Sequence, residues 1–223
     1  MSIRQTFENL LDGAAVTLQV TALAVAWGTV LAVLVGLAGL SRSIVLRAVV
    51  RVYVEVFRGV SAVILLFWVY FALPAFGFFL SPLQAGVLAL GINLAAYGSE
   101  IVRGAVQAVP RGQTEAATAI NLSAPRRTWS IVLPQATVAM LPPYGNLVIE
   151  VMKASALVSL ISLHDLTYEA QNLRRLPGSD SLEVFTAVLI LYFAISLGIT
   201  GIVRLLERRF GRGLDIGRAA AVK

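Results

Sequence analysis

The 223-residue sequence has no cysteine and a single histidine, His164. A zinc site of cysteine and histidine ligands is therefore excluded, as is a disulfide scaffold. Lysine occurs only at positions 153 and 223, and neither lies in the G-x-x-x-x-G-K-[ST] pattern of a P-loop. The chain also lacks the G-x-S-x-G pattern of a hydrolase nucleophile. These absences argue against an ATPase and against a membrane-embedded hydrolase.

Charge is also scarce. Charged residues make up 13% of the chain, whereas a soluble domain has about 25%. Stretches without any charge cover residues 13–41, 59–99 and 184–203. A helix needs roughly 20 apolar residues to cross a bilayer, so the sequence predicts an all-α integral membrane protein. The net charge of +6 fits basic loops beside a membrane and gives no reason to expect a nucleic-acid partner.

Five transmembrane helices are expected. The stretch 59–99 is too long for one crossing, at about 60 Å of helix, and Pro74, Gly77 and Pro82 predict a turn within it. The predicted spans are 13–40, 57–73, 83–104, 137–163 and 184–206. They leave an extracytoplasmic N-terminal segment at 1–12, a membrane domain at 13–210 and a cytoplasmic tail at 211–223.

The basic residues predict the orientation. The segments 41–58, 103–136 and 204–223 hold 14 of the 18 lysines and arginines. Basic residues concentrate in cytoplasmic loops, so these segments are expected inside the cell. The opposite side carries only Arg4, Arg174 and Arg175. The N-terminus is then outside and the C-terminus inside, which agrees with an odd number of spans.

The connection at 104–134 is unusually long for a structureless loop, and such loops are commonly functional. Residues 114–120 predict a short helix, and Asn121 is a residue that adopts the left-handed conformation at helix ends. A second short helix is expected at 126–133, ended by Pro134. The alternative is a solvated loop with no function of its own.

The spacing of residues in this loop matches a known motif. Glu115-Ala116-Ala117, then Asn121, then Ile131, Leu133 and Pro134 resemble the E-A-A-x3-G-x9-I-x-L-P motif of ABC importer permeases. The flanking sequence is similar to the branch that takes up polar amino acids, of the histidine and glutamine type. The stretches that carry this likeness are 53–59, 96–105, 109–113, 133–136, 141–143 and 206–209.

The resemblance implies a type-1 ABC importer permease fold in a bacterial plasma (inner) membrane. It also implies the partners: an identical or sister permease, two cytoplasmic ATPase subunits and an extracytoplasmic solute-binding protein. This chain would bind no cofactor, because ATP and magnesium belong to the ATPases. The coupling loop at 104–134 would dock on the ATPase. The motif residues that would couple the two are Glu115, Ala116, Ala117, Asn121, Ile131, Leu133 and Pro134.

The sequence departs from the family pattern at two informative places. Asn121 replaces the motif glycine, and asparagine is the usual second choice for a positive φ. The family's Lys-Asp-Thr-Ser-Leu stretch reads Lys153-Ala154-Ser155-Ala156-Leu157 here, so an acidic residue is missing. The expected solute is a small polar one, either an amino acid or a related zwitterion such as an ectoine-like compatible solute.

Asn146, Glu150 and Lys153 fall on one stripe of the fourth predicted span, within roughly 60° of the helix surface. Charges at membrane depth face a protein interior or a watery cavity, so these residues are candidates for the substrate pathway. The alternative is a structural ion pair between Glu150 and Lys153. Glu100 with Arg103 has the same spacing and is expected to pair. His164 and Asp165 are expected at a solvated boundary.

Two functions of other classes compete with the permease. A stand-alone secondary transporter driven by an ion gradient would account for Glu150 and Lys153 but leaves the long cytoplasmic loop without a role. A membrane-embedded enzyme would need a nucleophile and a base, and no such set is evident.

The charge distribution makes a topological prediction. Single cysteines replacing Phe78 and Arg127 in this cysteine-free chain should differ in their reaction with an impermeant maleimide. In intact cells position 78 should be labelled and position 127 protected, because basic loops stay in the cytoplasm. The reverse labelling pattern would overturn the predicted orientation.

Overall fold

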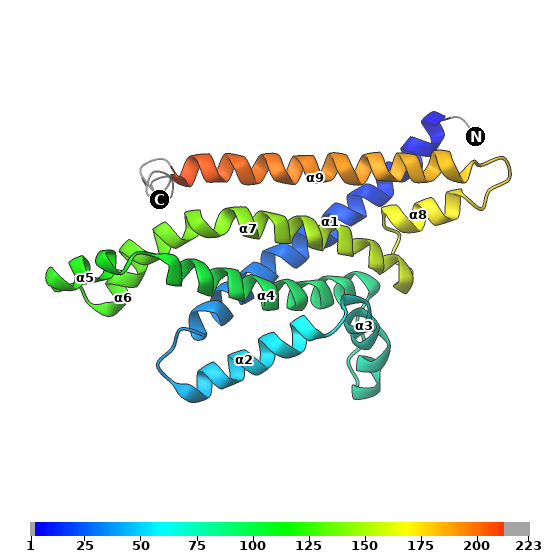
Figure 1. The fold of residues 1–223 in the computed structure, drawn as a ribbon. Helices are drawn as coiled ribbons and strands as arrows, with labels where there is room; N and C mark the ends of the chain where they lie inside the picture. The colour runs from blue at the N-terminus through cyan, green and yellow to red at the C-terminus, as the bar shows by residue number, and fades with distance from the viewer. Residues whose placement is uncertain (1–2, 212–223) are drawn as a thin grey trace.

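The computed structural model describes residues 3–211, and residues 212–223 of the predicted tail lie outside this range. Every regular element within it is helical, which confirms the all-α fold (Figure 1). The α-helices are α1 (Ile3–Ala38), α2 (Ile44–Gly59), α3 (Ala62–Phe67), α4 (Pro82–Ala108), α5 (Arg111–Ala119), α6 (Ala124–Arg127), α7 (Leu133–Ala154), α8 (Leu166–Leu173) and α9 (Ser181–Gly211).

Four helices in the described part of the chain are long and apolar enough to cross a membrane by themselves: Leu10–Ala38, Pro82–Ala108, Ala124–Ile161 and Ser181–Gly211. They correspond to the first, third, fourth and fifth predicted spans. The bent pair made by α2 and the segment after it supplies a fifth crossing if it is one span.

α1 and α4 pack against each other at very close range. A Cβ added at Gly28 would lie 2.8 Å from the backbone oxygen of Gly91. The Trp27 ring lies against Gly91, and its indole N–H donates to the Val87 carbonyl at 3.0 Å. Small residues permit such approaches between membrane helices, so these glycines hold α1 and α4 together as the centre of the fold.

The second predicted span, 57–73, is wrong as a straight helix. α2 ends at Gly59, and the helical segment that starts at Ala62 runs at 101° to it. Val60 and Ser61, between the two, are extended, each with ψ of 135°. The basic segment predicted as a loop at 41–58 is therefore mostly helix α2.

Side chains from α4 stabilise this break. A helix end leaves carbonyl groups without helical partners, and a bilayer offers no water to bind them. The Asn93 amide donates to the Phe57 carbonyl at 3.2 Å, and the Tyr97 hydroxyl donates to the Arg58 carbonyl at 3.2 Å. The position of the bend depends on these contacts between helices. The apolar pattern of residues 57–73 gives no sign of them, so it could not predict the bend.

The second short helix predicted in the loop does not stop at Pro134. α6 continues through a π-helical turn (Thr128–Val132) into α7 and then a 3₁₀ segment (Ser155–Ile161), giving one continuous span of 38 residues, Ala124–Ile161. Pro134 lies ten residues inside this span, directly after the π turn. In the turn before it, the Leu133 N–H donates to the Thr128 carbonyl, five residues earlier.

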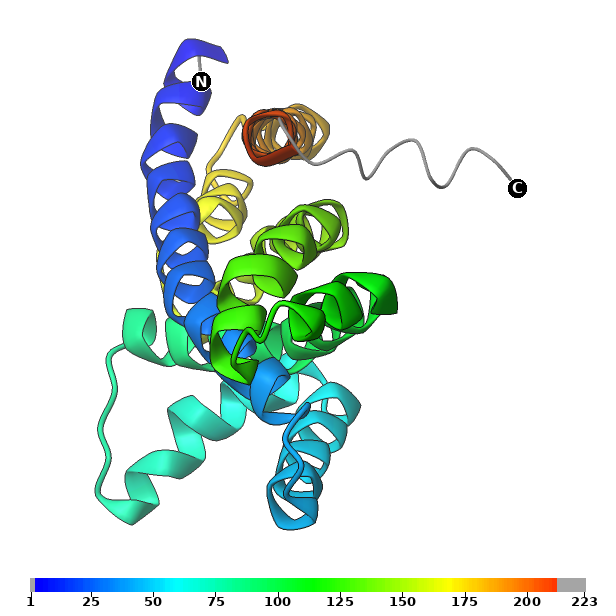
Figure 2. The same ribbon diagram turned by 90° about the vertical axis from the view of Figure 1, so that its left-hand side faces the viewer.

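The remaining helices close one end of the bundle. α8 packs against α1 and α9 in a small apolar cluster that includes Leu10, Leu166 and Val188. Seen from the α5–α6 end, α2 and the segment after its bend diverge from the other helices (Figure 2). The loop of α5 and α6 and the α8 region therefore lie at opposite ends of the molecule (Figure 1).

Candidate functional site

The α5 helix ends as the sequence predicts. Asn121 has a positive φ of 57°, and the Leu122 N–H donates to the Ala117 carbonyl at 3.1 Å. The Ile120 N–H donates to the Ala116 carbonyl at 3.3 Å. A left-handed residue followed by this closing bond is the usual way to end a helix and reverse the chain. Asparagine thus makes the turn that the motif assigns to glycine.

α5 is tied to the long helix that follows it. The Arg127 guanidinium donates to the Thr118 hydroxyl at 2.7 Å. Thr114, Glu115, Thr118, Ala119 and Arg127 line a hollow of about 460 Å³ between the two elements. The loop is consequently a compact helical hairpin with its own hydrogen bonds, and the alternative of a structureless solvated loop is wrong.

The motif residues in α5 do not share one environment. Glu115 and Ala116 are exposed, whereas Ala117 is only 1% exposed and packs within the chain. Two large apolar residues that the motif does not include, Ile120 and Trp129, are each 70% exposed. We refer to Glu115, Ala116, Ile120 and Trp129 as the coupling patch. The sequence offered a signal for these two members: Ile120 directly precedes the turn at Asn121, and Trp129 is a large aromatic residue between Thr128 and Ser130.

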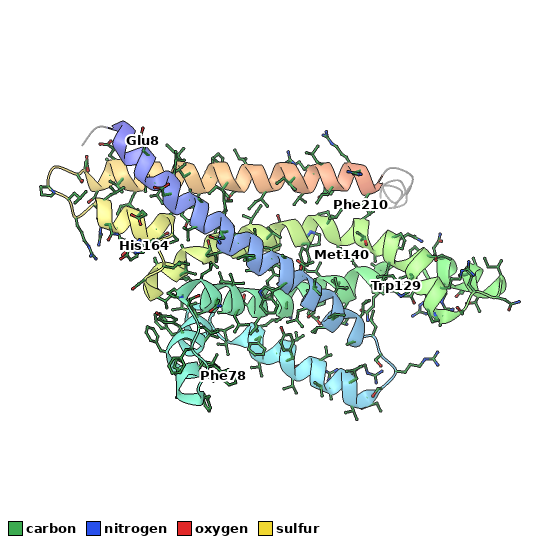
Figure 3. The ribbon with its side chains drawn as sticks, turned by 180° about the vertical axis from the view of Figure 1, so that it is seen from behind. Glu8, Phe78, Trp129, Met140, His164 and Phe210 are labelled. Atoms are coloured by element: carbon green, nitrogen blue, oxygen red, sulfur yellow. The ribbon has the colours of Figure 1, made fainter. Side chains whose placement is uncertain are left out.

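The second half of the motif lies where the loop enters the membrane helices. Ile131 and Leu133 are partly buried and Pro134 is exposed. Leu133, Pro134 and Trp129 line an apolar cavity of about 640 Å³ together with residues that include Met140 and Phe210. Figure 3 shows Trp129, Met140 and Phe210 near the same end of the bundle. These motif residues therefore join the hairpin to α7 and α9.

Asn146, Glu150 and Lys153 form an exposed polar stripe along α7, as predicted. The opposite face of α7 is buried, with Leu147 and Val151 in the main core. Within the described residues Glu150 and Lys153 form neither an ion pair nor a hydrogen bond with each other, so the structural ion pair weighed as an alternative is not what the chain adopts. The stripe lies on the same continuous helix as Trp129, roughly 36 Å away at its far end.

Glu100 and Arg103 do form the predicted pair. The Arg103 guanidinium donates to both Glu100 carboxylate oxygens, at 2.6 and 3.0 Å. It also donates to the Gln107 amide oxygen at 3.3 Å. The three side chains form a polar row along the last turns of α4, next to the start of α5.

The expectation of a solvated boundary is wrong for Asp165. Its side chain caps α8, with Oδ1 accepting the Tyr168 N–H at 3.0 Å. The residue is 0% exposed because Gly13 of α1 packs onto its backbone, where an added Cβ would lie 2.9 Å away. The preceding residue, His164, is exposed as expected, and it pairs with Glu169 at 3.3 Å.

The second carboxylate oxygen of Asp165 has no hydrogen-bond partner within the described chain. Burial raises the pKa of this carboxyl from 3.8 to about 6, although hydrogen bonds from Tyr168 and Thr167 act in the opposite direction. A raised pKa in the folded state means that this group stabilises the fold fully below pH 3.8. That contribution is lost as the pH rises through about 6.

Replacing Asp165 with asparagine should remove this pH dependence. The thermal unfolding midpoint of the purified protein in detergent should be higher for Asp165→Asn than for wild type at about pH 7.5, and the difference should shrink towards about pH 5. Asp180→Asn is the matched control, since Asp180 accepts the Leu182 N–H at 2.9 Å in an exposed position. A difference between Asp165→Asn and wild type that does not change with pH would contradict the assignment.

The chain is similar to known transport proteins over most of its length. It is 46% identical over 201 residues to the probable amino-acid ABC transporter permease protein y4tF of Sinorhizobium fredii, covering 87% of this chain and 84% of that protein. It is 37% identical over 203 residues to the glutamine transport system permease protein GlnP of Escherichia coli, covering 90% and 92%.

The fold is shared with a solved structure, described as an amino acid ABC transporter with histidines, at a TM-score of 0.83 and 33% identity, covering 91% and 94% of the two chains. The family described as the binding-protein-dependent transport system inner membrane component matches residues 28–212. This chain therefore belongs to that family, the permease subunits of ABC importers, and is not a stand-alone secondary transporter.

Proposed function

We propose that the chain imports a small zwitterionic solute of the amino-acid type, paired with an identical or sister permease. Two cytoplasmic ATPases that hold ATP and magnesium would drive it, and an extracytoplasmic binding protein would deliver the solute. One observation carries this proposal: the continuous helix Ala124–Ile161 carries Trp129 of the coupling patch near its start and the exposed polar stripe near its end. No loop interrupts this helix, so a movement imposed at Trp129 is carried along it, past the internal Pro142 and Pro143, to the stripe.

The coupling patch would dock on the ATPase. Ile120 and Trp129 are largely exposed, and exposed apolar patches mark interaction surfaces. Ala116, which is small and exposed, lets a partner groove approach the α5 backbone closely. Ala117, Ile131 and Leu133 support the patch from the inner side. Asn121 reverses the chain so that the patch faces away from the bundle.

The polar stripe would line the solute path. Charges on a membrane helix face a cavity or a protein neighbour rather than lipid, and the stripe is exposed on the isolated chain. Glu150 and Lys153 are not paired with each other, so an acid and a base are available to the ammonium and carboxylate of a zwitterion. Asn146 adds an amide. Ala154 follows the lysine where the family pattern has an acid, which favours a carboxylate-bearing or ectoine-like solute.

The orientation supports the same arrangement. The inner-membrane location follows from the family, and the basic loops favour the α5–α6 end as cytoplasmic. The α8 end, with His164 and Glu169 at its surface, would then meet the binding protein outside.

Docking is tested best at Ala116. Ala116→Arg should leave membrane insertion intact, because the side chain is exposed, and should weaken co-purification of the ATPase by about 30-fold. Ala75→Arg, at an exposed alanine in the short 3₁₀ turn Leu73–Phe76, should have no effect. Asn121→Gly should be tolerated and Asn121→Ile should not, because a β-branched residue resists a positive φ. ATPase recovery and uptake equal to wild type in Ala116→Arg would remove the docking proposal.

The solute path is tested with the double variant Glu150→Gln, Lys153→Met. It keeps the net charge, so it should assemble with its ATPase yet lose the ATP hydrolysis that the loaded binding protein stimulates in liposomes. The matched control is Glu207→Gln with Arg204→Met, which also keeps the net charge and lies on α9 at the end away from the binding protein. Stimulation and uptake at wild-type levels in the Glu150–Lys153 variant would exclude the stripe from the path.

A further inference from the structure

α2 has two exposed flanks of opposite character. One flank is apolar and carries Val45, Val49, Val52 and Val56, with exposed fractions between 48% and 73%. The other carries Arg47, Arg51, Glu55 and Arg58, at the i, i+4, i+8 and i+11 spacing of one helix stripe. Between them Val54 is buried against the bundle. Such a helix borders lipid with its apolar flank and presents basic side chains beside it.

The basic flank forms one wall of a cavity of about 420 Å³. Glu100 and Arg103 of α4 form the facing wall, and Gly39, directly after the end of α1, closes the third side. Four guanidinium groups and two carboxylates line this cavity. Arg103 already binds both carboxylate oxygens of Glu100, so these two charges balance. The other charges that line the cavity are three arginines and one carboxylate, Glu55.

The remaining arginines are weakly engaged. Arg58 lies over the Tyr97 ring at 5.0 Å, and Arg47 donates to the Ser41 carbonyl at 3.1 Å. Arg51 makes no hydrogen bond or ion pair within residues 3–211. The cavity therefore holds an excess of positive charge, with guanidinium groups free to bind an anion. Arginine suits phosphate in particular, because its planar fork donates two parallel hydrogen bonds.

We propose that this cavity binds the phosphate of an anionic phospholipid of the cytoplasmic leaflet, through Arg47 and Arg51. The cavity extends from Gly39, just after α1, along α2 to Arg58. The start of α2 lies towards the α5–α6 end of the bundle (Figure 1), and basic pockets between membrane helices at the cytoplasmic side bind lipid headgroups. The valine flank keeps α2 at the edge of the bilayer, so a headgroup reaches the arginines laterally while its acyl chains stay in the membrane.

This proposal concerns neither the coupling patch nor the polar stripe. It is tested on the purified protein reconstituted with equal amounts of phosphatidylglycerol and phosphatidylcholine, by native mass spectrometry of the lipids that it retains. Wild type should retain phosphatidylglycerol preferentially. Arg47→Gln with Arg51→Gln should reduce this preference about 30-fold. Arg174→Gln with Arg175→Gln, an exposed pair at the other end of the molecule, should leave it unchanged.

Three outcomes would overturn the proposal. One is an unchanged preference in the Arg47–Arg51 variant. Another is full release of the phosphatidylglycerol by millimolar inorganic phosphate, which would identify a site for the free anion. The third is a change in the number of permease chains per particle, which would make the cavity a contact between copies. If the double variant does not fold, the lipid preference of Arg51→Gln alone replaces it. The thermal unfolding midpoint of wild type is then also compared in phosphatidylglycerol and in phosphatidylcholine, and equal midpoints in the two lipids would overturn the proposal.

Discussion

The hydrogen bond from the Leu133 N–H to the Thr128 carbonyl closes the turn that leads into Pro134, within a helix of 38 residues. Proline cannot donate, and within a regular helix its ring collides with the carbonyl four residues earlier. The wider π turn changes the bonding register just before Pro134, so the helix passes from the α5–α6 hairpin into α7 without a break. Because of this turn, Trp129 of the coupling patch and the polar stripe lie on one continuous helix.

Features that depend on residues adjacent in the sequence could be predicted from the sequence. The span at 83–104, the left-handed Asn121 and the pair of Glu100 with Arg103 all follow from local pattern, and each is found in the structure. The expected stop at Pro134 failed for a local reason as well: the pattern shows a proline but not the bonding register of the turn before it.

The other corrections come from contacts between distant residues. Asp165 sits beside the lone histidine in a polar stretch, and only the packing of Gly13, some 150 residues earlier, removes it from solvent. Ala116 and Ala117 are adjacent residues of the same type, yet the fold exposes Ala116 and buries Ala117. Sequence periodicity assigns a residue to a helix face. Which face is buried depends on where the fold places the other helices.

The end of α2 constrains how the protein can move. The carbonyls of Phe57 and Arg58, which have no helical partner at the end of α2, are bound by Asn93 and Tyr97 of α4. Sliding α4 past α2 by one helical turn would strip both carbonyls at once. These two bonds therefore favour α2 and α4 moving together, so that rearrangement is easier at the other surfaces of the bundle.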